Sequence, residues 1–537
     1  MAFNDYEIGL ADTAINAALA VDERVKRAPA QFTRIGATSN HFKPRGEMLR
    51  GERTKFRVFT KPYRGARARN FVKAAINEGP APMSLGYQRC SYSWSDLMMV
   101  QAGIKWNMMQ DLKHDDLKLA VMGLVNQLFA EAERDTDERR EVGLMLGKNC
   151  AMGTVTQIYD VDGTTFTGAA GHAAAYICIT DAPIARFQVG DVLDIYDEGS
   201  SNDGTKNATV VVQAVIYGQD GPPTSSGLPE AGVGPGIICE PCAANGSTTT
   251  GTGYDTAWNA TGLPATGDFI ARSGEFSART SLDETTGVGP NNFSGIPDWF
   301  DPAVPTLRDE DGDYLTKTSA ANLWANPFRL IASGATIGTA STYQEFDPDL
   351  HLAALADDWI MAVKAGRADR RTLNQGNPGG VNQEIAISEH LVMVVEPKMH
   401  NHIVNGAEDK LRFTHTSQMN EASAKALKMI GVEGFEGYVW HSATLGEVLM
   451  QPDTNCKPHT AFILEPSSFF WITPPGGDRV QWLSHGSAGR VWPIHGDTLG
   501  TPTFSRQAMA YRMCGLMCDQ PKANAIIEGI LTAREAG

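Results

Sequence analysis

The sequence has few cysteines for its length. It contains 8 in 537 residues, and only Cys239 with Cys242 and Cys514 with Cys518 lie close together along the chain. A disulfide-stabilised scaffold is therefore excluded, and we expect reduced thiols. Cys239 and Cys242 have the spacing of half a zinc site, but no second Cys or His pair follows at the usual distance. The sequence predicts no metal.

Long apolar runs are also missing. No stretch of about 18 apolar residues occurs, and the N-terminus lacks the basic start and apolar segment of a secretory signal. We therefore expect a protein made in the cytoplasm, without a membrane partner.

Signatures of catalysis and nucleotide binding are absent as well. The glycines at 232, 234 and 236 do not follow G-x-G-x-x-G, and neither G-x-S-x-G nor a P-loop occurs. His400 and His402 are two residues apart, which on a helix directs them to different faces. The run from Asp309 to Asp313 begins like a calcium loop but lacks the closing Glu, and we expect an exposed turn there. The sequence predicts neither an enzyme nor a cofactor.

Charge is distributed very unevenly along the chain. The formal net charge is −16, yet the window from Arg24 to Lys73 holds fifteen basic and two acidic residues. That window carries +13, so −29 remains for the other residues. A basic arm on an acidic body favours contact between the arm and the acidic surface of the same or another chain, or with a polyanion. A solvated tail is the alternative.

Two strands and one long helix are predicted in the first third. Thr54 to Lys61 and Cys90 to Val100 read as the strands of a long hairpin. From about His114 to Leu146 the apolar residues step by three or four, which predicts a helix on the order of 45 Å long. A coiled coil is the competing interpretation. The apolar stripe consists of Leu117, Val121, Leu124, Leu128 and Ala132.

Strand patterns dominate between Tyr176 and Pro241. The segments AYICIT, FQVGDVLDIYD, ATVVVQAVIYG and GIICEP predict four short strands and a small inserted barrel. Strand character resumes at GDFIARSGEF. Asp347 to Arg367 has a helical pattern, and the strand LVMVVEP leads into a short helix at KMHNHIVNG. A length of 537 residues corresponds to three or four structural units of about 150 residues.

The order of these elements is more informative than any one of them. This order resembles that of the major capsid protein of tailed bacteriophages, which has the Hong Kong 97-type fold. It consists of a basic arm, a long hairpin, a long helix, a β-rich body with an insertion, and a mixed α/β end. The segment GDFIARSGEFSARTSLDETTGVGPNNFSGIPDW looks like the one that follows the insertion in relatives that carry one. The ending MAYRMCGLMCDQPKANAIIEGI looks like the family's closing strand, with Cys518, Asp519, Pro521 and Ala523 in its Cys-Asp-x-Pro-x-Ala run.

The resemblance implies an α+β fold with an N-terminal arm, an E-loop, a spine helix, a peripheral domain and an axial domain. By matching, these parts are the arm at 1–50, the E-loop hairpin at 51–104, the spine helix and first part of the peripheral domain at 105–175, the inserted β domain at 176–243, the second part of the peripheral domain at 244–345, the axial domain at 346–500, and the closing strand and tail at 501–537.

The resemblance also implies a function. A subunit of this family assembles as pentamers and hexamers into the icosahedral shell around the dsDNA genome of a tailed phage, in the virion, after assembly in the host cytoplasm. Its partners would be its own copies, scaffolding, portal and decoration proteins, and packaged dsDNA bound without sequence specificity. An exported surface-layer or carbohydrate-binding β-rich protein is the alternative. The candidate subunit-interface residues are Arg57, Lys61, Arg64, Arg67, Arg69 and Lys73.

Overall fold

The computed structural model describes residues 38, 42–48, 53–59, 87–107, 115–160, 174–197, 205–217, 220–223, 229–231, 234–242, 264–278, 290–337, 342–347, 350–352, 354–355, 358–359, 390–403, 438–442, 446–474, 480–483, 492–495 and 502–532. They fall into two compact units. The first lies within Leu97–Val142 and Thr473–Cys514, and the second within Gly36–Asp96, Gly143–Ile472 and Gly515–Gly537. Two elements, α2 (Asp115–Leu146) and β23 (Pro502–Cys518), contribute residues to both units.

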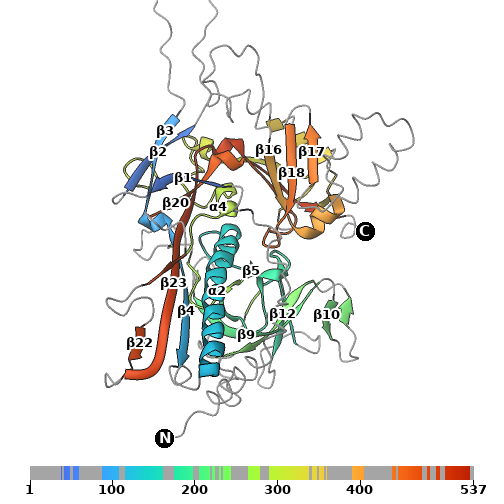
Figure 1. Cartoon of the computed structure of the whole chain (residues 1–537). Helices are drawn as coiled ribbons and strands as arrows, with labels where there is room; N and C mark the ends of the chain where they lie inside the picture. Colours follow the sequence, from blue (N-terminus) through green and yellow to red (C-terminus); the bar gives the residue numbers. More distant parts are fainter. Residues whose placement is uncertain are drawn as a thin grey trace, which may run out of the picture. The chain divides into compact units, whose positions relative to one another are not determined.

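The first unit combines the predicted long helix with a strand ladder. Strand β4 (Met98–Asn107) pairs antiparallel with β23 over ten residues, and β21 (Gln481–Trp482) and β22 (Trp492–His495) also pair with β23. Helix α2 lies alongside these strands (Figure 1), where Arg512 of β23 donates to Asp137 and the Trp482 indole N–H donates to Glu133 at 2.9 Å. These contacts fix one face of the helix against the ladder.

Helix α2 confirms the prediction from the apolar stripe. Its 32 residues correspond to about 48 Å. Of the five stripe residues, Ala132 is buried, and the side chains of the other four lie outside the described part of the chain. The last turn of α2 carries no basic residue.

The predicted hairpin is present in the second unit, but the prediction of one strand over Cys90–Val100 was wrong: β3 ends at Ser93, a 3-10 turn spans Trp94–Asp96, and the residues from Met98 onward belong to β4, which pairs with β23. Strand β2 (Arg53–Phe59) pairs antiparallel with β3 (Tyr87–Ser93) in a register that places Arg53 opposite Ser93 and Phe59 opposite Tyr87. Residues alternate between its two faces, as they must in a strand. Phe56 is buried and packs on Tyr92 at 5.7 Å and on Phe470 at 5.7 Å between ring centroids. One face of the hairpin is therefore anchored to the second unit.

The four strands predicted between 176 and 241 belong to a closed barrel. The antiparallel order is β5-β13-β8-β9-β12-β7-β6, and β5 and β6 are consecutive parts of one segment. Between them, the Val155 N–H donates to the Asp268 carbonyl and the Thr156 N–H to the Cys178 carbonyl, so the segment joins the first and last strands. The strands are Gly153–Thr154 (β5), Gln157–Asp160 (β6), Ala175–Cys178 (β7), Val192–Tyr196 (β8), Lys206–Ile216 (β9), Gly236–Pro241 (β12) and Phe269–Arg272 (β13).

The barrel extends beyond the stretch in which its strands were predicted. Its ring is completed by β5, β6 and β13, which come from before residue 176 and after residue 243. A short two-stranded sheet, β10 (Asp220–Pro223) with β11 (Pro229–Ala231), is inserted between β9 and β12. The insertion bounds of 176–243 stay a prediction.

A six-stranded mixed sheet makes the other part of the second unit. Its order is β14-β24-β19-β16-β18-β17. The predicted helix after residue 347 is present, with helical residues at 350–352, 354–355 and 358–359, and its Leu352, Leu355 and Trp359 are fully buried against this sheet. The strands are Phe328–Ile331 (β14), His390–Val395 (β16), Tyr438–Ser442 (β17), Gly446–Pro452 (β18), Thr460–Leu464 (β19) and Ala525–Glu528 (β24).

Short elements complete the second unit. Strand β1 (Lys43–Met48) pairs with β20 (Phe469–Thr473), which pairs with the end of β23. Strand β15 (Gln344–Glu345) pairs with β25 (Ile530–Leu531), and helix α4 spans Ile296–Phe300. The fold is α+β, and its elements follow the order that the sequence resemblance implies: hairpin, long helix, barrel, mixed sheet and closing strand.

Candidate assembly site

The outward face of the β2–β3 hairpin is strongly basic. Arg53, Lys55, Arg57 and Arg89 are exposed on it, and we call these four residues the hairpin's basic face. Arg57 and Arg89 lie directly opposite each other across the two strands. Like charges in that position destabilise a hairpin. Glu310 lies 3.8 Å from the Lys55 ammonium and 4.0 Å from the Arg89 guanidinium, so it offsets part of this charge.

The structure locates one of the six predicted interface residues on this face. Arg57 lies in β2, with its side chain exposed. Lys61, Arg64, Arg67, Arg69 and Lys73 lie outside the described residues. Sequence reasoning missed Arg53, Lys55 and Arg89 as members of the same face. The alternation of basic residues with Phe56 and Val58 in β2 is the signal that could have found the first two.

A buried ion pair holds the base of the hairpin. Asp96, the last residue of the 3-10 turn that follows β3, accepts bonds from the Arg308 guanidinium at 3.1 and 3.2 Å, and both side chains are buried. Arg308 also donates to the Gly312 carbonyl at 3.0 Å and lies over the Tyr314 ring, 3.8 Å from its centroid. Buried charges are tolerated when they are paired and hydrogen-bonded in this way.

The same network reaches Lys148, two residues after the end of α2. The Tyr314 hydroxyl donates to Asp96 at 3.2 Å and accepts from the Lys148 ammonium at 2.9 Å. Lys148 also donates to the Pro305 carbonyl at 2.9 Å. The base of the hairpin and the end of the long helix are therefore joined through three side chains.

The predicted turn from Asp309 to Asp313 is present, between Arg308 and Tyr314 of this network. One oxygen of Asp309 accepts the backbone N–H groups of residues 311, 312 and 313 at 2.8 to 3.0 Å, and Gly312 has a φ of +100°. A carboxylate that accepts hydrogen bonds from the backbone N–H groups of the residues that follow it stabilises a tight turn. The turn packs against the basic face, because the Arg53 guanidinium lies on Gly312, where a Cβ would have no room.

The C-terminal end of α2 is capped by a distant segment. The Asn292 amide donates to the carbonyls of Gly143 and Gly147 at 2.8 and 2.7 Å, which satisfies helix-end acceptors that have no partner within the helix. Gly147 ends the helix with a φ of +77°, as a C-terminal glycine commonly does. A Cβ on Gly295 would lie 2.7 Å from the Leu144 carbonyl oxygen, so glycine permits this close approach.

Replacing Gly295 with alanine is expected to lower the free energy of unfolding by about 1–3 kcal/mol, because the added methyl forces the capping segment away from the helix end. Gly103→Ala is the matched control, since a Cβ at Gly103 would meet nothing within 4 Å. Denaturant titrations of the two variants measure both effects. Equal stabilities for the two variants would contradict the close approach.

One arginine joins three parts of the second unit. The Arg186 side chain is buried and donates to the carbonyls of Met145, Met152 and Asn455 at 3.2, 3.0 and 2.6 Å. Burial lowers the pKa of Arg186 to about 10, against the raising influence of Cys456, Asp453 and Asp181. The guanidinium therefore stays charged near neutral pH and links the barrel, the end of α2 and the loop after β18.

The cysteines occupy buried positions. All eight are free thiols. Burial raises the pKa of Cys90 to about 12 and that of Cys178 to about 11, which leaves both protonated and unreactive near neutral pH. Among the described residues, no group of three or more His, Cys, Asp and Glu side chains could hold a metal ion. No described helix is long and apolar enough to cross a membrane.

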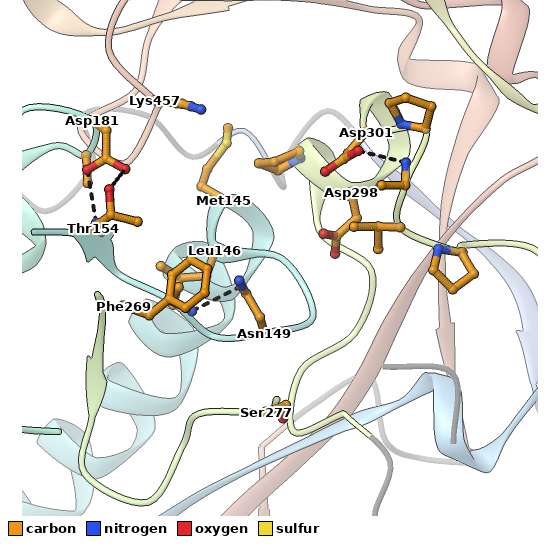
Figure 2. Close-up of a pocket in the computed structure, with 18 of the residues that line it drawn as sticks. Met145, Leu146, Asn149, Thr154, Asp181, Phe269, Ser277, Asp298, Asp301 and Lys457 are labelled. Atoms are coloured by element: carbon orange, nitrogen blue, oxygen red, sulfur yellow. Dashed lines mark hydrogen bonds between the residues drawn. The ribbon is translucent and has the colours of Figure 1, made fainter. Parts of the chain in front are cut away.

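A pocket of about 620 Å³ lies within the second unit, beside the end of α2. Figure 2 shows Leu146 and Phe269 along its wall, Asp181 and Lys457 on one side and Asp298 and Asp301 on the other. Asp181 accepts from the Thr154 hydroxyl at 2.5 Å, so this carboxylate is engaged within the barrel. The pocket's carboxylates and ammonium groups form a mixed polar lining rather than a site of one charge.

Several solved structures are similar to this chain. The chain is 10% identical to the cyanophage A-1(L) capsid asymmetric unit, covering 91% of this chain and 90% of that one, with a TM-score of 0.36. The capsid of Myoviridae phage XM1 matches at 8% identity over 92% and 91% of the two chains, with a TM-score of 0.33. The capsid of the native GTA particle matches at 10% identity over 92% and 89%, with a TM-score of 0.31.

The chain is similar to capsid proteins. All three of these solved structures are named as capsids. No protein-family model and no curated protein matches the chain. The comparisons give no support to the alternative of an exported surface-layer or carbohydrate-binding protein.

Proposed function

We propose that this protein is the structural subunit of a tailed-phage capsid, and that it self-assembles as pentamers and hexamers into an icosahedral shell around dsDNA. The proposal rests on this chain's own elements. The observation that carries it is the β2–β3 hairpin, which has one face anchored to the second unit and four basic side chains on the other. A monomeric protein gains little from ordering such a face.

The charge of the chain suggests a partner for the basic face, namely the acidic surface of a second copy. The chain as a whole has a net charge of −16, so a second copy offers acidic surface. On α2, Asp135 and Glu138 are exposed and illustrate such surface. Complementary potentials steer association and set the register between partners. We propose that the hairpin's basic face, continued by Lys61, Arg64, Arg67, Arg69 and Lys73, clamps neighbouring subunits together.

The residues that lead into the hairpin support the same role. The Thr38 hydroxyl donates to Asp453 at 2.6 Å, and Phe42 packs on Phe469 and Trp471 with ring centroids 5.2 and 6.4 Å apart. Termini are usually poorly ordered unless they are tied down. The end of the arm is thus attached to the second unit, and we propose that the basic residues before Thr38 contact a neighbour or packaged DNA.

Negative-stain electron microscopy and light scattering of the purified chain, alone and with a scaffolding protein, test the proposal. Closed shells with pentameric and hexameric units are expected. A concentrated protein that stays monomeric under both conditions would show the proposal to be wrong.

A further inference from the structure

One tyrosine occupies the junction between the base of the hairpin and the end of α2. The Tyr314 hydroxyl donates to Asp96 at 3.2 Å and accepts from the Lys148 ammonium at 2.9 Å. Two cations also lie over its ring, with Lys148 Nζ at 4.1 Å and Arg308 Cζ at 3.8 Å from the centroid. The side chains of Asp96, Lys148 and Arg308 are all buried. Tyr314 is therefore bonded at once to the base of the hairpin and to the segment that follows the helix.

The hairpin reaches Tyr314 through the backbone as well. The Ser91 N–H of β3 donates to the Arg308 carbonyl at 3.1 Å, and Arg308 and Tyr314 form an antiparallel β-bridge. The Arg308 guanidinium also holds the Gly312 carbonyl at 3.0 Å, and Arg53 of the basic face lies on Gly312. A displacement of the hairpin therefore acts on Arg308 and Tyr314 together.

The end of the helix depends on Lys148 in turn. Its backbone N–H donates to Asp298 at 2.7 Å, and its ammonium donates to the Pro305 carbonyl and the Tyr314 hydroxyl, each at 2.9 Å. A buried ammonium needs these acceptors, because water cannot replace them. If Tyr314 is drawn away with the hairpin, Lys148 must follow it or lose an acceptor. Either change loosens the last turn of α2, which ends two residues before Lys148.

We propose that Tyr314 is a positioning residue that couples the hairpin to the end of α2, so that a displacement at the hairpin's basic face loosens the end of the helix. The coupling runs through the hydroxyl, which joins two buried charges, and it is a property of the single subunit. Hydrogen bonds in such a buried chain depend on one another, because an unpaired charge there is costly. The consequence for assembly rests on the proposed function: a neighbour that clamps the basic face would change the stability of the helix end.

The test is hydrogen exchange of the backbone amides of residues 144–146, in the last turn of α2, measured on the full-length, unassembled chain. Gly312→Ala supplies the displacement, because Gly312 has a φ of +100° and an added Cβ would collide with the Arg53 guanidinium. The exchange rates should rise about tenfold, as expected for the loss of a hydrogen bond to a charged group. Gly334→Ala is the matched control, since Gly334 has a φ of +80° but a Cβ there would meet nothing within 4 Å. Its rates should change less than about twofold.

Tyr314→Phe separates coupling from general destabilisation, because phenylalanine keeps the ring and removes only the hydroxyl. In this background, Gly312→Ala should leave the exchange rates within about twofold of those of Tyr314→Phe alone. An equal rise with and without the hydroxyl would overturn the proposal, and so would equal rates for Gly312→Ala and Gly334→Ala in the otherwise wild-type chain. The second comparison decides the matter by itself if Tyr314→Phe fails to fold. Neither comparison needs an assembled shell, so a failure of the coupling is distinguishable from a failure of the proposed function.

Discussion

Replacing Arg308 with methionine is expected to lower the free energy of unfolding by about 3–5 kcal/mol. The substitution leaves the buried Asp96 carboxylate without its countercharge and also removes the bonds of Arg308 to the Gly312 carbonyl and the Ser95 hydroxyl. Removing one partner of a buried pair costs far more than the pair contributes, because the remaining charge is stranded away from water. Denaturant titration of the purified chain measures the loss.

Arg329→Met is the matched control for this experiment. Arg329 also pairs with a carboxylate, Glu528, but its side chain is 41% exposed against 9% for Arg308. Exposed pairs contribute up to about 1 kcal/mol, since water and salt screen both charges. Equal losses for the two variants would mean that the Asp96–Arg308 pair does not hold the base of the hairpin as its burial implies.

Reversing the charge of the hairpin's basic face is expected to weaken assembly strongly without unfolding the subunit. In the variant Lys55→Glu, Arg57→Glu, Arg89→Glu, three exposed cations become anions. Under the proposed clamp, these anions would meet a neighbour's acidic surface. Each exposed contact contributes only up to about 1 kcal/mol, but three reversed contacts per subunit repeat around the shell. We expect the concentration required for assembly to rise at least about tenfold, as measured by light scattering in the absence of nucleic acid.

A charge-conserving variant separates electrostatics from shape. Lys55→Arg, Arg57→Lys, Arg89→Lys keeps all three charges and should still assemble. Wild-type assembly should weaken as salt rises, because the Debye length falls to about 8 Å at physiological ionic strength. Reversal of Arg64, Arg67 and Arg69 to Glu extends the test to the residues beyond β2. Empty shells that form normally from the reversed variants, but lose DNA, would assign the basic residues to the genome instead.

The spacing of apolar residues along the sequence was sufficient to predict several helices and strands. The period of the apolar residues located α2 to within a residue of its observed start at Asp115. Alternation located β2, and the runs of β-branched residues located β7, β8, β9 and β12. The strand predicted at Cys90–Val100 overlapped β3 only at its end, because the pattern did not reveal the 3-10 turn at Trp94–Asp96 that separates β3 from β4. Side-chain direction in helices and strands is set by backbone geometry, so it is visible in the order of residues.

The barrel's closure could not be predicted in the same way. Its first and last strands are β5 and β6 of one segment, and β13 completes the ring from more than a hundred residues downstream. Strands this short carry little pattern of their own, and their partners are chosen by hydrogen bonds between segments far apart in sequence.

The amino-acid sequence by itself determined the type and order of the elements, the excess of positive charge near the hairpin and the resemblance to phage capsid proteins. Only the tertiary structure decided which charges are buried. Asp96, Lys148, Asp298, Arg308 and Lys317 look like ordinary surface residues in the sequence, yet all five are buried. Whether a charge is solvated or paired depends on the segments that fold over it, and those segments are brought together by packing rather than by neighbouring residues in the chain.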